Sequence, residues 1–174
     1  MPTVRKDVIK IGDIFATVFG DDVSVGQVAP EFTSVVSGWA PVNPLQDSKG
    51  KVIILSAVPS LDTEVCDRET RRFNAEAAKL SNDIVIYTIS TDFPMAQKRW
   101  CGAAGVDKIK VVSDVLEADF GIKYGLLIKE RRYLRRAVFI VGRDGKLVYV
   151  KYMTVLGEEP NYDEVFEAAK AALK

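Results

Sequence analysis

Histidine does not occur anywhere in the 174 residues, and its absence excludes several common kinds of site. Catalysis by Ser-His-Asp or Cys-His needs an imidazole as base, so a cysteine hydrolase of the usual kind is ruled out. The two cysteines, Cys66 and Cys101, are by themselves too few to hold a structural zinc ion. Reactive chemistry therefore has to come from cysteine, lysine, carboxylate or hydroxyl groups, or from a cofactor that the sequence does not reveal.

The chain also lacks an excess of either charge and any long apolar run. Lys and Arg together number 24, as do Asp and Glu, so the formal net charge is zero. Nucleic-acid binding needs a basic surface, and a membrane span needs about 18–20 apolar residues in a row. The first ten residues lack the apolar core of a secretory signal. We therefore expect a cytoplasmic protein that binds neither nucleic acid nor membrane.

The order of the predicted elements indicates an α/β fold. Apolar runs at 51–58, 84–90 and 109–113 are typical of strands buried on both faces of a sheet. A helix from about Thr63 to Leu80 is predicted between the first two. A second helix, from Pro94 to Gly102 or Gly105 with Asp92 as its cap, is predicted between the next two.

The rest of the chain completes a mixed sheet. Strands at 137–141 and 147–152 flank a Gly-Arg-Asp-Gly turn typical of a β-hairpin, and an amphipathic helix at 161–174 closes the chain. We expect a thioredoxin-like fold, a mixed central β-sheet flanked by helices, in a single domain over 1–174. The glycine- and proline-rich segment before Gly50 supports only a short strand at 13–19, and so an N-terminal β extension.

Cys66 stands in the first turn of a helix that follows directly on a buried strand. Helix N-termini present unpaired N–H groups and a positive dipole end, which stabilise an anion. A thiol there ionises more readily, and the thiolate is the reactive form. Thr63 is placed to cap the helix and bring a hydroxyl near the sulfur, and Pro59 shapes the turn. Because free cysteines often fill apolar cores, position alone leaves inert packing open.

The local sequence favours a reactive cysteine. Residues 58–66 (VPSLDTEVC) resemble the active-site segment of thiol peroxidases, an atypical two-cysteine class of peroxiredoxin, whose core pattern Pro-x-x-x-Thr-x-x-Cys is met by Pro59, Thr63 and Cys66. Residues 96–102 (AQKRWCG) are similar to the segment that carries the family's resolving cysteine. Residues 136–139 (RAVF) are similar to the strand start that carries its active-site arginine.

Two departures from the family pattern stand near the cysteines. Glu64 replaces a proline and Trp100 replaces a phenylalanine that many relatives have. Neither change removes a group that the chemistry needs. The resemblance extends from about Gly26 to the C-terminus.

The resemblance implies both a reaction and roles for five residues. The Cys66 thiolate would reduce hydrogen peroxide or an organic hydroperoxide, and Cys101 would then capture the sulfenic acid in an intramolecular disulfide. Arg136 would stabilise the thiolate and orient the peroxide; it is preferred to Arg135 only on the match of residues 136–138. Thr63 would hydrogen-bond the thiolate and peroxide oxygens, and Pro59 would shield the site from water.

The resemblance further implies partners. Thioredoxin is the expected reductant, a homodimer is the expected assembly, and no metal or organic cofactor is needed. Two alternatives stay open: a thioredoxin-like dithiol oxidoreductase, whose usual Cys-x-x-Cys is broken here by Glu69, and a binding module whose cysteines only fill the core. Rapid peroxide consumption that depends on Cys66 would separate the peroxidase from both.

Overall fold

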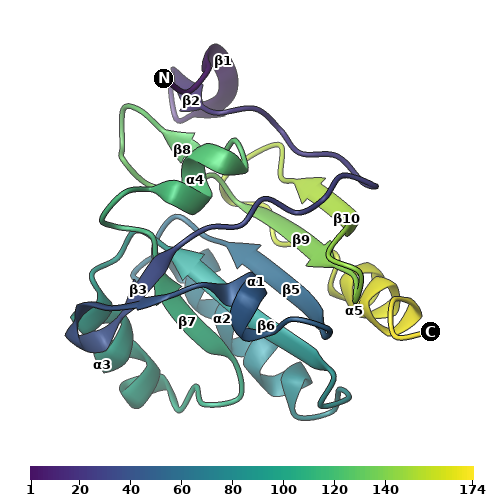
Figure 1. The fold of residues 1–174 in the computed structure, drawn as a ribbon. Coiled ribbons are helices and arrows are strands. Elements are labelled where there is room, and N and C mark those ends of the chain that lie inside the picture. The colour runs from purple at the N-terminus through teal and green to yellow at the C-terminus, as the bar shows by residue number, and fades with distance from the viewer.

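The computed structural model describes residues 1–174 and is centred on a seven-stranded mixed sheet (Figure 1). The strands lie in the order β10-β9-β5-β6-β7-β3-β4. Strands β5, β6 and β7 run parallel, and every other neighbouring pair is antiparallel. In chain order the strands are β3 (Ser34–Val36), β4 (Ala40–Val42), β5 (Val52–Ala57), β6 (Ile84–Ser90), β7 (Lys110–Ser113), β9 (Ala137–Val141) and β10 (Leu147–Tyr152). The predicted mixed sheet is confirmed.

The strands predicted from apolar runs form the middle of this sheet. β5 and β9 are buried along their whole length because both have a strand on each side and layers on both faces. Alternate residues of β5 serve opposite cores: Ile53 and Leu55 face one cluster, Val52 and Ile54 the other.

Helices cover both faces of the sheet. The longer ones, α2 (Glu64–Ala77), α3 (Pro94–Ala104) and α5 (Tyr162–Ala171), contribute to the core on one face. The short α4 (Asp119–Lys123) contributes Phe120 to the other face, while α1 (Pro44–Asp47) and the 3₁₀ turn η1 (Ser37–Trp39) lie in the segment leading to β5. No helix has the length and apolar character needed to cross a bilayer.

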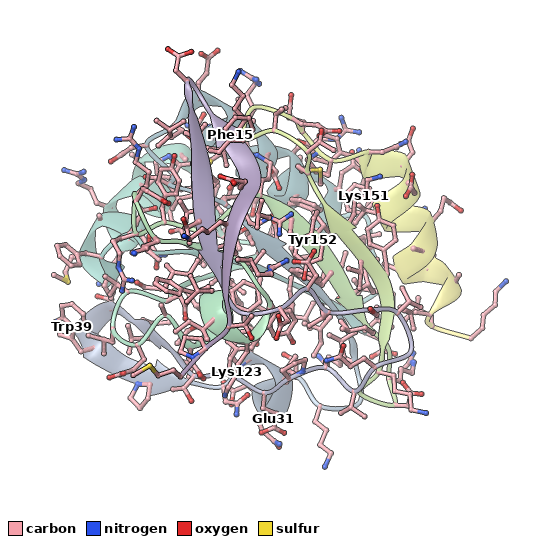
Figure 2. All side chains as sticks on the ribbon, turned by 90° about the horizontal axis from the view of Figure 1, so that it is seen from above. Phe15, Glu31, Trp39, Lys123, Lys151 and Tyr152 are labelled. Carbon is pink, nitrogen blue, oxygen red and sulfur yellow. The ribbon has the colours of Figure 1, made fainter.

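The predicted N-terminal extension is a hairpin. β1 (Val4–Ile11) pairs with β2 (Ile14–Phe19), and β2 pairs with β8 (Leu127–Ile128) in a separate three-stranded sheet. Figure 2, viewed from above, shows this hairpin lying across the molecule, with Phe15 on it. The hairpin docks closely at Gly20, whose φ is +87° and where an added Cβ would meet the carbonyl oxygen of Ile122 at 1.8 Å. Only glycine fits there.

The start of α3 differs from the prediction. Its N-cap residue is Phe93, and Asp92 does not cap the helix. The Asp92 carboxylate instead accepts hydrogen bonds from Ser60 Oγ (2.7 Å), Leu61 N (2.9 Å) and Ser90 Oγ (2.7 Å). Asp92 therefore fixes the loop between β5 and α2, because the donors of Ser60, Leu61 and Ser90 outcompete the helix end.

Candidate active site

Cys66 lies in the first turn of α2 and is completely buried. Its side chain belongs to a small apolar cluster with Val58 and Leu61, residues of the loop that links β5 to α2. Thr70, one turn later, donates its hydroxyl to the carbonyl of Cys66 at 2.7 Å. The strand-to-helix junction predicted around Cys66 is present, with a sulfur shielded from bulk water.

The start of β9 brings Arg136 to this sulfur. β9 runs antiparallel to β5, with Ala137 opposite Ala57, so the residue before β9 lies beside the loop that leads into α2. The Arg136 guanidinium donates from Nη2 to Cys66 Sγ at 3.2 Å and from Nε to the carbonyl of Leu156 at 2.9 Å. A thiolate accepts such a charge-assisted bond more strongly than a neutral thiol.

Glu69 completes the site, and the sequence analysis missed it. It lies three residues after Cys66, on the same face of α2, and is completely buried. Arg136 Nη1 donates to Glu69 Oε2 at 2.5 Å, and Ser56 Oγ donates to Oε1 at 2.9 Å. A charged residue in a helix is usually expected on the surface. The spacing of three residues from Cys66 nevertheless predicts that Glu69 lies on the same face of the helix as the cysteine.

Burial and ion pairing shift the pKa values of Glu69 and Arg136 in opposite directions. Burial raises the pKa of Glu69 above its usual range, although Arg136 opposes the shift. Burial alone would lower the pKa of Arg136, but the charges of Glu69 and Cys66 outweigh it and raise that pKa. Arg136 is therefore held as a cation beside the sulfur. Buried charges with perturbed pKa values gather at functional sites.

Pro59 and Thr63 lie at an open hollow of about 230 Å³ on the Arg136 side of the cysteine. Pro59 is buried, and Thr63 is exposed at the N-cap position of α2. The Thr63 hydroxyl donates to the carbonyl of Ser60 at 2.9 Å, and its oxygen accepts no hydrogen bond from the backbone N–H groups of α2. The predicted capping bond is therefore absent. The remaining lining residues are Glu64, Val65, Tyr133, Arg136, Leu156 and Gly157.

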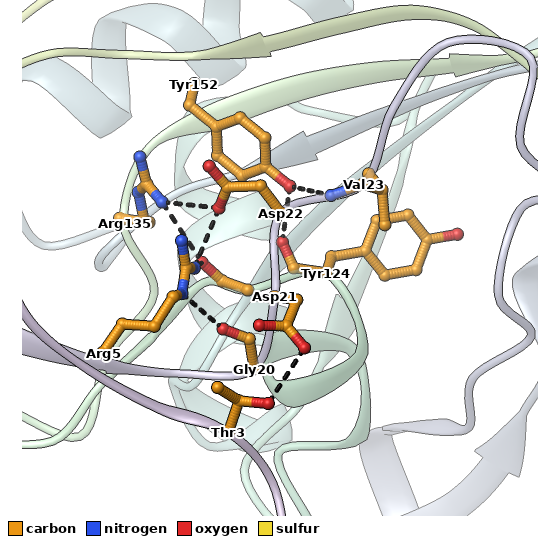
Figure 3. Close-up of polar contacts among 10 residues, drawn as sticks. Thr3, Arg5, Gly20, Asp21, Asp22, Val23, Tyr124, Arg135 and Tyr152 are labelled. Atoms are coloured by element: carbon orange, nitrogen blue, oxygen red, sulfur yellow. Dashed lines mark hydrogen bonds and ion pairs between the residues drawn. The ribbon is translucent and has the colours of Figure 1, made fainter.

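Arg135 lies away from the cysteine. Its Nη1 contacts Asp22 Oδ1 at 3.0 Å, and its guanidinium lies 4.4 Å from the centre of the Tyr152 ring. Figure 3 shows Arg5 reaching the same Asp22 carboxylate from the N-terminal hairpin, at 2.9 Å. Of the two adjacent arginines, only Arg136 contacts the sulfur.

Cys101 lies in the second half of α3 and is half-buried. Both cysteines are free thiols, and they pack in different apolar clusters. Burial raises the pKa of Cys101. Trp100, the preceding residue, packs against both clusters. The structure thus places the two cysteines on adjoining helices without joining them. No group of three or more acidic or cysteine side chains is arranged to hold a metal ion.

Comparison with known proteins gives sequence relatives over most of the chain. Residues 24–166 match the family described as Redoxin. The thiol peroxidase of Bacillus subtilis (strain 168) is 50% identical over 158 residues, which cover 91% of this chain and 93% of the relative. The thiol peroxidase of Halalkalibacterium halodurans is 47% identical over 157 residues, with 90% and 93% covered.

Solved structures share the fold. A peroxiredoxin-like protein from Aquifex aeolicus superposes with a TM-score of 0.86 at 34% identity, over 97% of this chain and 99% of that one. The thiol peroxidase from Chromobacterium violaceum gives a TM-score of 0.80 over 95% and 96% of the two chains. Its identity is 20%, so this second likeness concerns the fold alone. Sequence and fold comparisons therefore agree on one group of proteins.

Proposed function

Because the chain belongs to the redoxin family and is a thiol-dependent peroxidase of the peroxiredoxin group, we propose that Cys66 is the sulfur that reacts with peroxide. The observation that carries the proposal is the 3.2 Å contact between Arg136 Nη2 and Cys66 Sγ. In the first step the thiolate attacks one oxygen of the hydroperoxide and the O–O bond breaks. An S–O bond forms and the sulfur becomes a sulfenic acid, while the other oxygen takes a proton from solvent and leaves as water or an alcohol.

Arg136 acts in this step through its charge. A buried guanidinium donates to the thiolate before reaction and to the peroxide oxygens as the O–O bond lengthens, where negative charge develops. Glu69 is a positioning residue: its carboxylate holds Nη1 while Nη2 remains directed at the sulfur. The carbonyl of Leu156 holds Nε. These two contacts keep the Nη2 donor in place before the substrate arrives.

The hollow beside Arg136 is the proposed route of the hydroperoxide. Pro59 shields the sulfur from bulk water, and the exposed Thr63 hydroxyl is available to the peroxide oxygens at the mouth of the hollow. The lining includes the side chains of Val65, Tyr133 and Leu156, which suit the organic part of a hydroperoxide.

Cys101 completes the proposed cycle. Its sulfur attacks the Cys66 sulfenic acid, an S–S bond forms, and the S–O bond breaks with release of water. Because the two thiols lie in separate clusters, this step requires a local rearrangement of α2 or α3. We further propose that thioredoxin reduces the disulfide and that the protein works as a cytoplasmic homodimer. The whole chain, 1–174, would act as one domain.

The test mixes reduced protein with one equivalent of cumene hydroperoxide and follows peroxide loss and free thiols. Wild type, Cys66→Ser and Cys101→Ser are run side by side. We expect wild type to consume the peroxide and lose both thiols, while Cys66→Ser is inert. Cys101→Ser should consume one equivalent and stop at the sulfenic acid. Equal, slow loss in all three proteins would overturn the assignment of both cysteines.

A further inference from the structure

Helices α2 and α3 are joined by a contact between the residues next to the two cysteines. Trp100 Nε1 donates to Asp67 Oδ1 at 3.0 Å. Arg71 supports this contact, since its Nε donates to Asp67 Oδ2 at 3.0 Å and its guanidinium lies 5.6 Å from the centre of the Trp100 ring. Arg71 Nη1 also donates to the carbonyl of Ala104, the last residue of α3, at 3.4 Å. Asp67, Arg71 and Trp100 are called the α2–α3 contact below.

Trp100 lies between the surroundings of the two sulfurs. Its ring packs against the apolar cluster of Cys66 and also against the cluster that Cys101 joins. Neighbouring residues on a helix point about 100° apart. Cys101 therefore does not face α2 in the direction that Trp100 takes, as long as this part of α3 keeps its helical form.

The second half of α3 is the less firmly held part of the helix. The buried residues of α3, Pro94 and Gln97, both lie in its first half. The Gln97 side chain is tied there by hydrogen bonds to Ser90 Oγ and to the carbonyl of Val112. Residues 100–104 are half-buried or exposed, and the helix ends at Gly105, whose φ is +68°. The α2–α3 contact is thus a main attachment of this half.

We propose that the α2–α3 contact holds Cys101 away from Cys66, so that its release sets the rate at which the disulfide forms. The inference rests on the proposed function of the two cysteines. When Trp100 leaves Asp67, the end of α3 unwinds and Cys101 reaches the sulfenic acid. The S–S bond then forms, the S–O bond breaks, and the Cys101 proton leaves with the hydroxyl as water.

The contact has a consequence for the lifetime of the sulfenic acid. While the contact holds, Cys66 remains a sulfenic acid, and a second molecule of peroxide has time to oxidise it to a sulfinic acid. A weaker contact gives faster capture by Cys101 and less sulfinic acid. The α2–α3 contact therefore lengthens the lifetime of the Cys66 sulfenic acid.

Trp100→Phe tests the proposal, because it keeps an aromatic ring and removes the N–H that reaches Asp67. Trp39→Phe is the matched control: Trp39 is exposed and lies against Phe93, ahead of α3 (Figure 2). Each reduced protein receives one equivalent of cumene hydroperoxide for the disulfide rate, or a series of larger amounts for the sulfinic acid, and samples are quenched with a thiol reagent at intervals. Mass spectrometry then counts sulfenic acid, disulfide and sulfinic acid, and peroxide loss is followed in parallel.

For Trp100→Phe we expect the disulfide to form about threefold to tenfold faster, as the loss of one hydrogen bond of ordinary strength implies, because the Asp67 carboxylate is partly open to solvent. Sulfinic acid should need more peroxide in about the same proportion, while peroxide loss stays within about twofold of wild type. Asp67→Asn, which keeps a neutral acceptor, should give a smaller acceleration and serves as the second variant if Trp100→Phe does not fold. Trp39→Phe should match wild type.

Several outcomes would overturn the proposal. Disulfide formation at the wild-type rate or slower in both Trp100→Phe and Asp67→Asn would do so, as would an equal acceleration in Trp39→Phe. These failures differ from a failure of the proposed function. If wild type shows no Cys66-dependent peroxide loss, the function itself is wrong; if peroxide loss is normal and the disulfide rate is unmoved, only the role of the α2–α3 contact is wrong.

Discussion

Arg135 and Arg136 are neighbours in the chain, yet their side chains enter two regions with opposite character. Successive side chains of extended backbone point to opposite faces, so the two guanidinium groups part at the start of β9. Arg136 enters a closed region with a completely buried carboxylate, Glu69, and the Cys66 sulfur. Arg135 enters a region where the carboxylate, Asp22, has a side chain 42% exposed and shared with Arg5 (Figure 3).

The difference teaches what each arginine contributes. Arg135 itself is buried, but the Asp22 carboxylate that it shares with Arg5 is partly open to solvent, so this ion pair adds less stability than a closed one and mainly attaches the N-terminal hairpin to the sheet. A fully buried pair costs desolvation that its attraction barely offsets, so stability alone does not explain Glu69 and Arg136. Under the proposed function, the value of the pair lies in a fixed positive charge beside the sulfur that reacts as a thiolate.

The largest expected effect follows from breaking the buried pair. Arg136→Met leaves the buried Glu69 carboxylate without its cationic partner, so the free energy of unfolding should fall by about 3–5 kcal/mol. The peroxidase kcat/KM should fall by about a hundredfold or more, as when a preorganised donor is removed from a reacting centre. Urea unfolding and peroxide consumption measure the two effects.

Two further variants separate stability from chemistry. Arg135→Met should cost about 1 kcal/mol and change activity by less than about threefold, because Asp22 keeps Arg5. The double variant Arg136→Met with Glu69→Leu removes both buried charges and should recover most of the lost stability while staying inactive. If Arg135→Met proved as harmful as Arg136→Met, the contrast between the two regions would be wrong.

A third carboxylate sharpens the comparison, because Asp114 is buried without an arginine. It accepts the backbone N–H groups of Phe120 (3.0 Å) and Gly121 (2.8 Å). Burial outweighs these bonds and, with the nearby charge of Asp119, raises the pKa of Asp114 to about 7. The folded protein therefore holds a proton there at pH values where the unfolded chain has released it.

The sign of the pH effect follows. The stability from this proton is complete below the ordinary carboxyl pKa and is lost as the pH rises through about 7. Between about pH 5 and pH 8, wild type should lose on the order of 2 kcal/mol relative to Asp114→Asn. Urea unfolding of both proteins at the two pH values measures it. Parallel pH profiles would show that Asp114 does not titrate in this range.

The smallest change in stability is expected at the partly exposed carboxylate of Asp22. Asp22→Asn removes the negative charge shared by Arg5 and Arg135 and keeps an acceptor oxygen, so it should cost about 0.5–1 kcal/mol. In about 1 M salt this difference should shrink, because screening weakens ion pairs that are open to solvent. Thermal unfolding at low and high salt measures the change. A salt-independent loss would indicate that the pair is more closed than its exposure suggests.

The central sheet was predictable because its strands are buried on both faces. An apolar run then marks the strand directly, and β6, β9 and β10 have the predicted bounds. The three-residue strands β3 and β4 leave no such signal, since β3 depends on a partner far along the chain, with Val35 opposite Ser113. Asp92 shows the same limit, because its tertiary donors determine its role.

The site was predictable where its residues belong to a short, continuous segment of the sequence. The segment 58–66 placed Cys66 at a strand-to-helix junction, and the match at 136–138 selected Arg136 over Arg135. Glu69 was missed because its burial depends on an arginine some distance along the chain. In the structure Glu69 shares the buried face of α2 with Cys66, Thr70 and Phe73.

The position of the two arginines constrains how this part of the chain can evolve. The residues on either side of them are fixed by backbone pairing. Leu134 forms a β-bridge with Leu127, and Ala137 pairs with Ala57. One residue inserted between Leu134 and Ala137, or deleted there, would exchange the two faces and turn the arginine that now reaches sulfur toward the hairpin. Lineages that keep the activity are therefore expected to tolerate substitutions around the arginines while conserving the number of residues between Leu134 and Ala137.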